Sequence, residues 1–368
     1  MSEPQIPIYV GMMSGTSMDG VDAVAAVFTN GRYQFIGRSS ESYSTHLRSS
    51  LISLCSSGPD EVLRCQECGN EVAKIYAKVF NKLLEGTGLE TSNICAIGAH
   101  GQTIRHSPQM GASTQLINGA LLAELTKTDV VTDFRSRDLA AGGEGAPLVP
   151  LFHKCVFSGS VPRGILNIGG ISNLTYLPAL GSDADVFGFD CGPGNVLMDG
   201  WTEKINGTPY DHDGMWARSG KVSEKLLALL KKEAFFDLTP PKSTGRELFN
   251  LGWLESKLSD ESVEDVQRTL VALTAGTITE AIERFAPDIQ ELFVCGGGAK
   301  NSLLMQEFTA MNPARAVKTT AALGMDAQDV EGAAFAWLAK RFVERQPGNL
   351  PSVTGAEGGR ILGALYPA

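Results

Sequence analysis

The strongest constraint on the fold is a kind of segment that occurs twice in the chain. Residues 8–24 read IYVGMMSGTSMDGVDAV, and residues 164–180 read GILNIGGISNLTYLPAL. In each, an apolar run ends in a turn of Gly, Ser and Thr or Asn, and a second apolar run follows, which is typical of a β-hairpin. A hairpin that is repeated once predicts two related lobes, of which the first has the longer and more polar turn.

Helical and strand patterns alternate after each hairpin. Residues 59–86 have apolar positions at helical spacing, and the apolar run ICAIGAHG at 94–101 reads as a buried strand. Asn118 is a suitable N-cap for the helix that follows it. A strand, a Gly turn and a helix are expected over 291–311, and a late helix over 329–345. This alternation predicts an α/β class with largely parallel central sheets, to which the hairpins add antiparallel strands.

The length of 368 residues is typical of about two domains. The loop-like stretch SGSVPRG at 158–164 is the natural place for a boundary. We therefore expect an N-terminal lobe over 1–160 and a C-terminal lobe over 161–368, with a tail that could pack back on the first lobe.

Composition and charge exclude several classes of protein. The formal net charge is -10, and no Lys/Arg cluster of the kind found in duplex-binding proteins is present. No apolar run is long enough for a transmembrane helix, and the first residues lack the pattern of a secretory signal. The seven scattered Cys residues are an odd number, which favours reduced thiols in the cytoplasm. We expect a cytoplasmic protein with no nucleic-acid or membrane partner.

Glycine is the outlier in composition. It supplies 41 of the 368 residues, about 11% against the roughly 7% of average proteins. Four Gly-rich turns each follow an apolar strand: MSGTSMDG, NIGGISN, FDCGPGN and CGGGAKN. Any one of them can be a purely structural turn. Four of them, distributed over both lobes, fit a large phosphate-bearing ligand, because backbone N–H groups can approach an anion closely at such turns.

The common nucleotide-binding motifs are absent. No G-x-x-x-x-G-K-[ST] pattern occurs, since PPKSTG at 240–245 has no preceding Gly, and no G-x-G-x-x-G opens a helix. What remains is phosphate held between two hairpins from two lobes, with CGGGAKN near the base or ribose.

That arrangement resembles the actin/hexokinase/Hsp70 ATPase superfamily. Within it, the chain is similar to the anhydro-N-acetylmuramic acid kinases from about residue 8 to the end. The resemblance rests on the following motifs, in this order: MMSGTSMDGVD, AIGAHGQTIRH, DFRSRDLAAGGEGAPLVP, LNIGGISN, FDCGPGNVLMD, PKSTGRELFN, VCGGGAKN and EGAAFAWLA. It implies a two-lobed actin-like (ribonuclease H-like duplicated) ATPase fold with a central cleft.

The resemblance also implies an activity. Enzymes of this family open the 1,6-anhydro ring of anhydro-N-acetylmuramic acid with water and phosphorylate O6 with ATP, within peptidoglycan recycling. ATP and Mg²⁺ are then the expected cofactors, and a homodimer is the expected assembly. Two alternatives stay open: a plain amino-sugar or hexose kinase, and a nucleotide-switched binding protein of the actin/Hsp70 type.

Asp190, in GFDCGPGN, is the candidate catalytic base. A carboxylate at the end of an apolar strand could accept a proton from water that attacks the anomeric carbon. The alternative is that Asp190 only caps the turn or the helix that begins near Gly194. The family's catalytic Asp falls on this motif, so the resemblance favours catalysis.

The resemblance assigns ATP binding to the first turn, where N–H groups and hydroxyls can hold phosphate oxygens. The expected residues are Gly15, Thr16, Ser17, Met18, Asp19, Gly20, Val21 and Asp22. Asp19 is the candidate for Mg²⁺ or its waters, and it is also the rival for the role of base. For Asp22, capping of the turn is the alternative.

Two further turns complete the expected nucleotide site. Gly169 and Gly170, with Ser172 and Asn173, would form the second phosphate hairpin. Gly296, Gly297 and Gly298 would let the backbone approach the nucleoside, and Asn301 could cap the following helix or touch the ribose.

The first lobe offers polar residues that suit a sugar with an N-acetyl group and a lactyl carboxylate. The candidates are His100, Gln102 and Arg135, with Thr103, Arg105 and Arg137 nearby in sequence, and Glu331 at the start of the late helix. An Arg would pair with the carboxylate. The alternatives are an interlobe hydrogen-bond network and, for Glu331, a favourable place at a helix N-terminus.

Overall fold

The computed structural model describes residues 6–29 and 31–368, which divide into two compact units. Unit 1 comprises the described residues up to Val156 together with Asp329–Ala368, and unit 2 comprises Phe157–Gln328. The first crossing between the units therefore lies close to the expected boundary at residue 160. The last 40 residues, which we had assigned to the second lobe with a tail that could pack back on the first, belong to unit 1.

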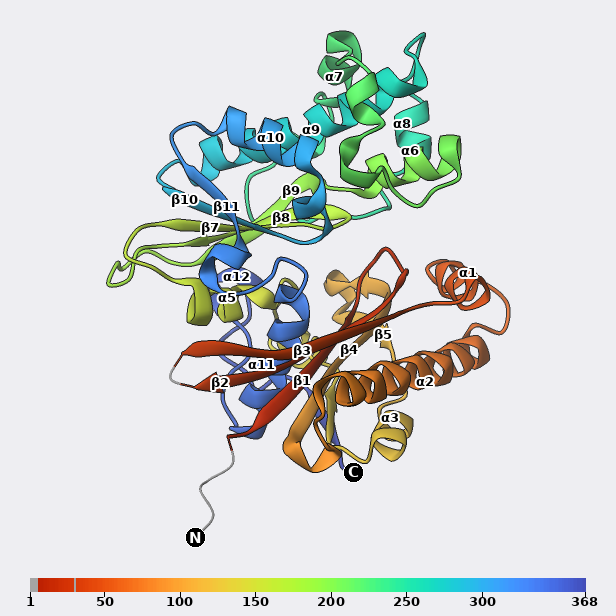
Figure 1. Ribbon diagram of the computed structural model, residues 1–368, viewed down its shortest axis with the longest axis vertical. Coiled ribbons are helices and arrows are strands. Elements are labelled where there is room, and N and C mark those ends of the chain that lie inside the picture. Colours follow the sequence, from red (N-terminus) through yellow and green to blue (C-terminus); the bar gives the residue numbers. More distant parts are fainter. Residues whose placement is uncertain (1–5, 30) are drawn as a thin grey trace. The chain divides into compact units, whose positions relative to one another are not determined.

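The sheet of unit 1 is built around the first hairpin (Figure 1). Its strands follow the order β12-β6-β4-β1-β2-β3, and β5 pairs with β4. Strand β1 is antiparallel to β2 and parallel to β4, and β4 is parallel to β6. The strands are β1 (Ile8–Ser14), β2 (Gly20–Thr29), β3 (Arg32–Ser42), β4 (Ile94–Ser107), β5 (Ala112–Leu116), β6 (Val130–Thr132) and β12 (Ala364–Tyr366).

The sheet of unit 2 repeats this path around the second hairpin. Its order is β11-β10-β7-β8-β9, with β7 antiparallel to β8 and parallel to β10. The strands are β7 (Arg163–Ile168), β8 (Ile171–Leu177), β9 (Phe187–Pro193), β10 (Glu291–Cys295) and β11 (Ala316–Thr319). Reading β1, β2, β3, β4 and β6 as β7, β8, β9, β10 and β11 gives the same order and the same strand directions.

This duplication confirms the predicted α/β fold with a repeated ribonuclease H-like topology. The hairpins add antiparallel strands as expected. The sheets are nevertheless less parallel than expected, because a third strand extends each hairpin into an antiparallel meander, β1 to β3 and β7 to β9. The connections between these successive strands are at most nine residues long, shorter than the crossover that parallel neighbours require.

Helices pack on both faces of the unit 1 sheet. Helix α2 (Glu61–Thr87), predicted over 59–86, shares a core with Val10 and Met12 of β1. Successive residues of a strand face opposite sides of the sheet, so Gly11 faces away from the core that holds Val10 and Met12. Helix α11 (Val330–Val343) packs on that opposite face. At Gly11 a Cβ would lie 1.9 Å from the Gly332 carbonyl oxygen, so the backbones of β1 and α11 almost touch. This contact of small residues packs α11 closely on β1 and is one of the contacts that join the last 40 residues to unit 1.

The remaining helices have the following bounds. In unit 1 they are α1 (Thr45–Leu54), α3 (Gly119–Thr126), α4 (Ser136–Leu139) and α12 (Pro351–Thr354), and α5 (Val149–Phe157) ends at the junction. In unit 2 they are α6 (Val196–Asn206), α7 (Glu224–Leu230), α8 (Leu251–Glu255), α9 (Val263–Phe285) and α10 (Ser302–Met311). Asn118 caps α3 as predicted, since its side chain accepts the N–H of Leu121 at 3.0 Å.

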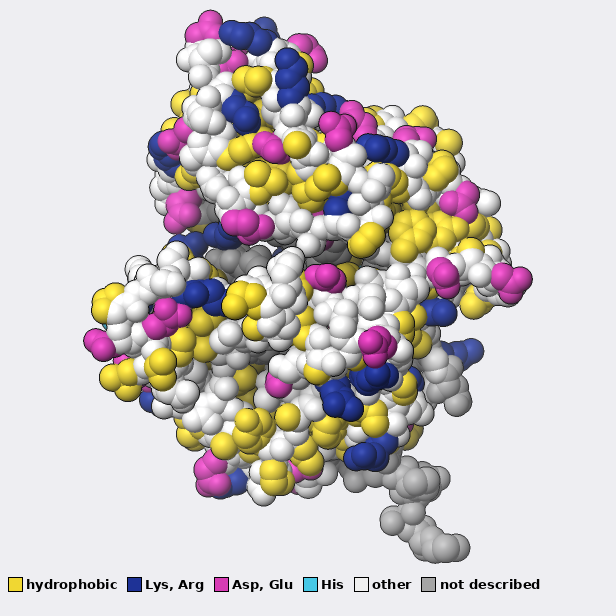
Figure 2. All heavy atoms as spheres, turned by 180° about the vertical axis from the view of Figure 1, so that it is seen from behind, with side chains coloured by type: hydrophobic (Ala, Val, Ile, Leu, Met, Phe, Trp, Pro, Cys, Tyr) yellow, Lys and Arg dark blue, Asp and Glu magenta, His cyan; other side chains and the backbone are white. Residues whose placement is uncertain are grey.

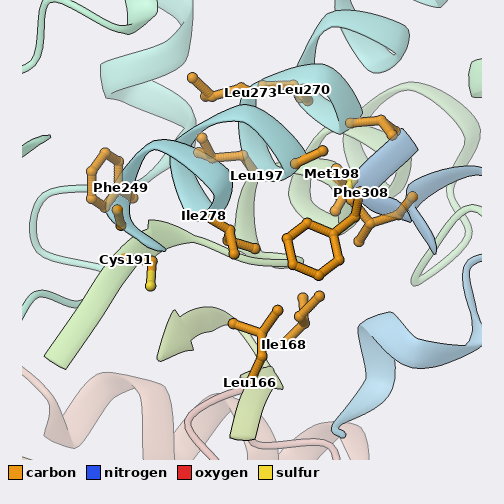
Figure 3. Close-up of a cluster of buried hydrophobic side chains, with 14 of the residues drawn as sticks. Leu166, Ile168, Cys191, Leu197, Met198, Phe249, Leu270, Leu273, Ile278 and Phe308 are labelled. Atoms are coloured by element: carbon orange, nitrogen blue, oxygen red, sulfur yellow. The ribbon is translucent and has the colours of Figure 1, made fainter. Parts of the chain in front are cut away.

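Figure 3 shows the core of unit 2, where side chains of β7 and β9 meet those of α6, α9 and α10. Leu166 and Ile168 of β7 are fully buried, and Leu197, Ile278 and Phe308 from the three helices belong to the same cluster. This core fixes β7, which leads into the second glycine turn, and β9, which carries Asp190.

The charged side chains are intermingled on the face that Figure 2 shows, with acidic and basic groups next to one another. Within the described residues, no helix combines the length and the apolar character that crossing a membrane requires.

Candidate active-site residues

The first glycine turn joins β1 to β2 over residues 15–19. It is closed by a hydrogen bond of 3.2 Å from the Met18 N–H to the Gly15 carbonyl. In the described part of the chain, no carbonyl accepts the N–H of Thr16 or Ser17. These two N–H groups are therefore free to bind an anion, as phosphate-binding turns require.

The other residues expected at this turn fall into two groups. Met18 and Val21 have buried side chains in the unit 1 core, so only their backbone could reach a ligand. Asp19 is exposed in the turn itself. Asp22 is exposed too, but it lies in β2, where it is paired with Met13 of β1 and Ser40 of β3.

The structure brings the candidate sugar-binding residue Arg135, at the start of α4, into contact with His100 in the middle of β4. Arg135 Nη2 lies 2.8 Å from His100 Nε2, and Arg135 Nη1 donates to the Gly145 carbonyl at 2.8 Å. Glu331, in the first turn of α11, favours the charged form of Arg135 electrostatically. Gln102 is fully buried two residues beyond His100, and its Nε2 donates to the Gly15 carbonyl at 3.0 Å.

The protonation state of this cluster follows from its burial. Burial and the nearby Arg135 charge hold the pKa of His100 well below its usual value, so the ring is neutral. A guanidinium can only donate, so Nε2 is the acceptor and the proton of His100 is on Nδ1. Burial also lowers the pKa of Arg135 to about 10, which leaves the guanidinium charged at neutral pH.

Three buried polar atoms of the cluster have no hydrogen-bond partner within the described residues. They are His100 Nδ1, Gln102 Oε1 and Arg135 Nε. Buried polar atoms in folded proteins are nearly always paired, so each exception needs an explanation. A polar ligand that forms the missing hydrogen bonds is one such explanation.

The neighbouring polar residues in the sequence lie outside this cluster. Arg105 forms an ion pair of 2.8 Å with Glu61 and donates to the Leu54 carbonyl at 3.2 Å, so it ties β4 to α1 and α2. Thr103 accepts a hydrogen bond from Gln115 on β5. Arg137 is exposed. Arg105 and Thr103 thus take part in a hydrogen-bond network, as the structural alternative predicted. The partners named here, however, lie in unit 1 and do not join the two lobes.

The second glycine turn, in unit 2, joins β7 to β8. The Gly169 carbonyl accepts the N–H of Asn195 at 2.8 Å, and the Gly170 carbonyl accepts those of Gly194 and Val196 at 2.8 and 3.0 Å. No described residue accepts the N–H of either Gly. The carbonyls are thus anchored to the start of α6, while the N–H groups stay available.

Asp190 lies on β9 beside Asn173 of β8, at a β-bulge. Asn173 pairs with Asp190 and Ser172 with Gly192, so Cys191 is the extra residue. The Ser172 hydroxyl, fully buried, donates to the Gly192 carbonyl at 3.1 Å and so holds the bulge. Bulges re-aim side chains and are frequent next to active sites.

The environment of Asp190 raises its basicity. Burial raises the pKa of this carboxyl to about 7, and the Thr244 N–H, which donates to Oδ2 at 2.9 Å, opposes the shift only in part. Within the described residues, no donor contacts Oδ1. Asp190 therefore offers one anchored oxygen and one free oxygen on a carboxylate with the pKa of an effective general base.

Lys242 and Thr244 position Asp190 and were not among the predicted site residues. The Lys242 carbonyl accepts the Asp190 N–H at 3.1 Å, and the buried Lys242 Nζ donates to the Phe235 and Phe236 carbonyls. The motif PKSTGRELFN, which contains Lys242 and Thr244, was the available signal. Its contact with β9 is long-range, so no local pattern reveals it.

The third glycine turn follows β10. Gly296 has a φ of +81°, and a Cβ there would lie 2.2 Å from Asn167 Oδ1, so only Gly fits this approach to β7. Gly297 and Gly298 open the short 3-10 helix that follows. Asn301 caps α10 through a hydrogen bond of 3.1 Å from the Leu304 N–H, which is the structural alternative named for it above.

No group of three or more metal-ligating side chains is found in the described ranges, 6–29 and 31–368. Asp19 is a single exposed carboxylate beside the free N–H groups of Thr16 and Ser17. Mg²⁺ usually keeps several waters and binds one or two carboxylates together with substrate phosphates. The donor set at the first turn therefore fits Mg²⁺ only together with a phosphate ligand.

Comparisons with known proteins place the chain in a family. Residues 7–368 match the family described as anhydro-N-acetylmuramic acid kinase. The protein of that name from Nitrosomonas europaea is 51% identical, with 98% of this chain and 99% of that protein covered. The protein of that name from Burkholderia cenocepacia is 50% identical, with 100% of this chain and 98% of that protein covered.

A solved structure, the (R)-2-hydroxyglutaryl-CoA dehydratase component A of Acidaminococcus fermentans, is 10% identical and aligns with a TM-score of 0.47. The alignment covers 90% of this chain and 95% of that chain. A likeness this weak adds nothing to the argument about the site, which rests on the family.

Proposed function

Because the chain belongs to the anhydro-N-acetylmuramic acid kinase family, we propose that it is an ATP-dependent kinase that hydrolyses the 1,6-anhydro ring of 1,6-anhydro-N-acetylmuramic acid and phosphorylates O6. The product is N-acetylmuramic acid 6-phosphate, an intermediate of peptidoglycan recycling. The single observation that carries the chemistry is Asp190, whose pKa is raised to about 7 by burial and whose Oδ1 is free.

Asp190 acts as the general base in this proposal. Its Oδ1 accepts a proton from water as the water oxygen bonds to C1 of the sugar. The bond between C1 and O6 breaks, and O6 attacks the γ-phosphorus of ATP, so ADP leaves with the electron pair of the broken P–O bond. The freed O6 is phosphorylated as it forms, so the reaction needs no separate acid for the leaving oxygen.

The polar cluster of unit 1 binds the sugar. The Arg135 guanidinium, held by the Gly145 carbonyl and His100, pairs with the lactyl carboxylate through its remaining N–H groups. Gln102 Oε1 accepts from the sugar amide or a hydroxyl, and Glu331 accepts from another hydroxyl. We propose the contacts of Arg135 and Gln102 because they would satisfy two buried atoms that lack protein partners, Arg135 Nε and Gln102 Oε1.

The glycine turns bind ATP. The N–H groups of Thr16 and Ser17 and those of Gly169 and Gly170 donate to phosphate oxygens. The turn at 296–298 approaches the nucleoside, and Asn301 acts there through its cap of α10. Asp19 would hold Mg²⁺ through its waters, and the ion would neutralise charge on the phosphates.

An assay in isotopically labelled water tests the proposal. The purified chain is incubated with ATP and the anhydro sugar, and the label at C1 of the product is measured against the rate of anomeric exchange. Incorporation at the rate of ADP formation is expected. A product that carries no label beyond exchange supports the plain kinase. ATP turnover that no sugar stimulates supports the nucleotide-switched protein.

The assembly and location of the enzyme complete the proposal. We expect a cytoplasmic homodimer without a nucleic-acid or membrane partner, in line with the family resemblance. Light scattering of the purified chain gives its molar mass, and a mass of about one chain would exclude the dimer.

A further inference from the structure

A closed ring of hydrogen bonds lies at the base of the first glycine turn, and it contains a residue that no step above uses. Tyr76 projects from α2 into the core of unit 1 and is fully buried. Its hydroxyl lies 2.9 Å from Ser14 Oγ and accepts the Gly101 N–H at 3.1 Å. Ser14 is the last residue of β1, immediately before the turn.

The donors in the ring can be assigned without ambiguity. The single hydroxyl proton of Ser14 goes to the Gly101 carbonyl at 2.9 Å. The Tyr76 hydroxyl must therefore donate to Ser14 Oγ. The ring runs from Gly101 N–H to Tyr76 to Ser14 and back to the Gly101 carbonyl. Each hydroxyl donates once and accepts once, so the bonds polarise one another and strengthen together.

The ring lies where the pairing of two strands changes register. Met12 pairs with Ala99 and Ser14 with Gln102, so β4 has one residue more than β1 between these pairs. His100 and Gly101 occupy this bulge. The next residue of β4, Gln102, donates to the carbonyl of Gly15 at 3.0 Å. The bulge therefore joins the phosphate turn on one side to the proposed sugar residues on the other.

We propose that Tyr76 is a positioning residue that sets the phosphate-binding turn and the sugar-binding segment of β4, residues 100–102, in register with each other. This inference rests on the proposed binding of ATP by the turn. Without the hydroxyl, Ser14 Oγ and the Gly101 N–H each lose a partner in a site closed to water, and the alternative arrangements of the bulge become accessible.

The substitution Tyr76→Phe tests the inference, since it removes one oxygen and preserves the ring that packs in the core. We expect the Kd for ATP, measured by calorimetry without sugar, to rise about fivefold, as the loss of about one hydrogen bond implies. The KM for ATP in the coupled assay should rise in parallel. A purely structural role would reduce the folded fraction, which lowers the apparent kcat and leaves KM and Kd unchanged.

The matched control is Tyr176→Phe. Tyr176 is buried on β8 of unit 2 and donates to Asp288 at 2.7 Å, at the end of the strand opposite the glycine turn. It should leave the Kd for ATP within twofold of the wild type. Ser14→Ala is the second test variant, and it should weaken ATP binding as Tyr76→Phe does, even if the latter folds poorly.

The outcomes separate this inference from the proposed function. A wild type that binds ATP but leaves the anhydro sugar unchanged contradicts the proposed function alone, and the Kd values still decide the role of Tyr76. A Kd for ATP within twofold of the wild type in Tyr76→Phe, or in Ser14→Ala should Tyr76→Phe not fold, overturns the inference.

Discussion

The first and second glycine turns occupy equivalent places in two sheets of the same strand order, yet they are held in different ways. In unit 1, side chains hold the turn: Ser14 donates to the Gly101 carbonyl in the β4 bulge, Gln102 donates to the Gly15 carbonyl of the turn, and Tyr76 completes the ring. In unit 2, backbone holds it, through the N–H groups of residues 194–196 at the start of α6. The same strand topology therefore allows a glycine turn to be held either by side chains or by backbone.

The difference extends to the chemistry that each unit carries. Unit 1 contains a cationic, donor-rich cluster around Arg135, whereas unit 2 contains a basic carboxylate, Asp190. Both groups lie at β-bulges, at His100–Gly101 in β4 and at Cys191 in β9. The repeat provides a strand end and a turn, and the bulge decides which side chain is presented there. We therefore expect substitutions in the two units to affect different kinetic constants.

The largest effect is expected for Asp190→Asn. The amide cannot take the proton of the attacking water, so kcat should fall about a thousandfold or more. Because Asp190 lies outside the three glycine turns proposed to bind ATP, the Kd for ATP should stay within twofold. Product formation and calorimetry measure the two quantities. Turnover close to that of the wild type would show that Asp190 is not the base and would favour Asp19, the alternative candidate.

A smaller effect, in binding instead of turnover, is expected for Arg135→Lys. An ammonium cannot contact His100, the Gly145 carbonyl and a carboxylate in the fixed geometry of a guanidinium. The KM for the sugar should rise about 10- to 100-fold, as expected for lost charge-assisted hydrogen bonds. Arg137→Lys, exposed two residues along the chain, is the control and should leave KM unchanged. Equal effects of the two variants would contradict the sugar-binding role of the cluster.

The pH dependence of kcat sharpens the assignment of the base to unit 2. The pKa of Asp190 is raised to about 7, so the carboxylate form that accepts a proton is lost as the pH falls through this value. At pH 6 the Asp190 carboxyl is ionised in about a tenth of the enzyme molecules, so kcat should be about tenfold below its plateau. A kcat that is flat between pH 5 and pH 8 would contradict this assignment.

The smallest effect is expected for Asn195→Ala in unit 2. The side chain donates to the Ile168 carbonyl at 3.0 Å, but the N–H that binds Gly169 belongs to the backbone and is retained. The KM for ATP should therefore stay within twofold of the wild type, in contrast to Ser14→Ala in unit 1. If both variants weaken ATP binding equally, the distinction between a side-chain anchor and a backbone anchor fails.

Much of the fold could be predicted from local patterns. The two hairpins, the helix over 59–86 and the N-cap at Asn118 follow from periodicity and from capping chemistry within a few residues. The motifs also placed glycine turns after β1, β7 and β10. The strand in FDCGPGN, however, continues to Pro193, so Asp190 lies within β9 and not at its end as predicted. Strand direction was misjudged, because alternation of strands and helices does not reveal which strands stay antiparallel within a meander.

The sequence by itself determined the repeat, the family resemblance and the residue types from which a site could be built. Only the tertiary structure decided which of these residues meet. The transfer of residues 329–368 to unit 1, the separation of Arg105 from Arg135, and the contact of Thr244 with Asp190 all join segments far apart in the chain. The raised pKa of Asp190 has the same origin, since burial is produced by the packing of distant segments and leaves no mark on the local pattern.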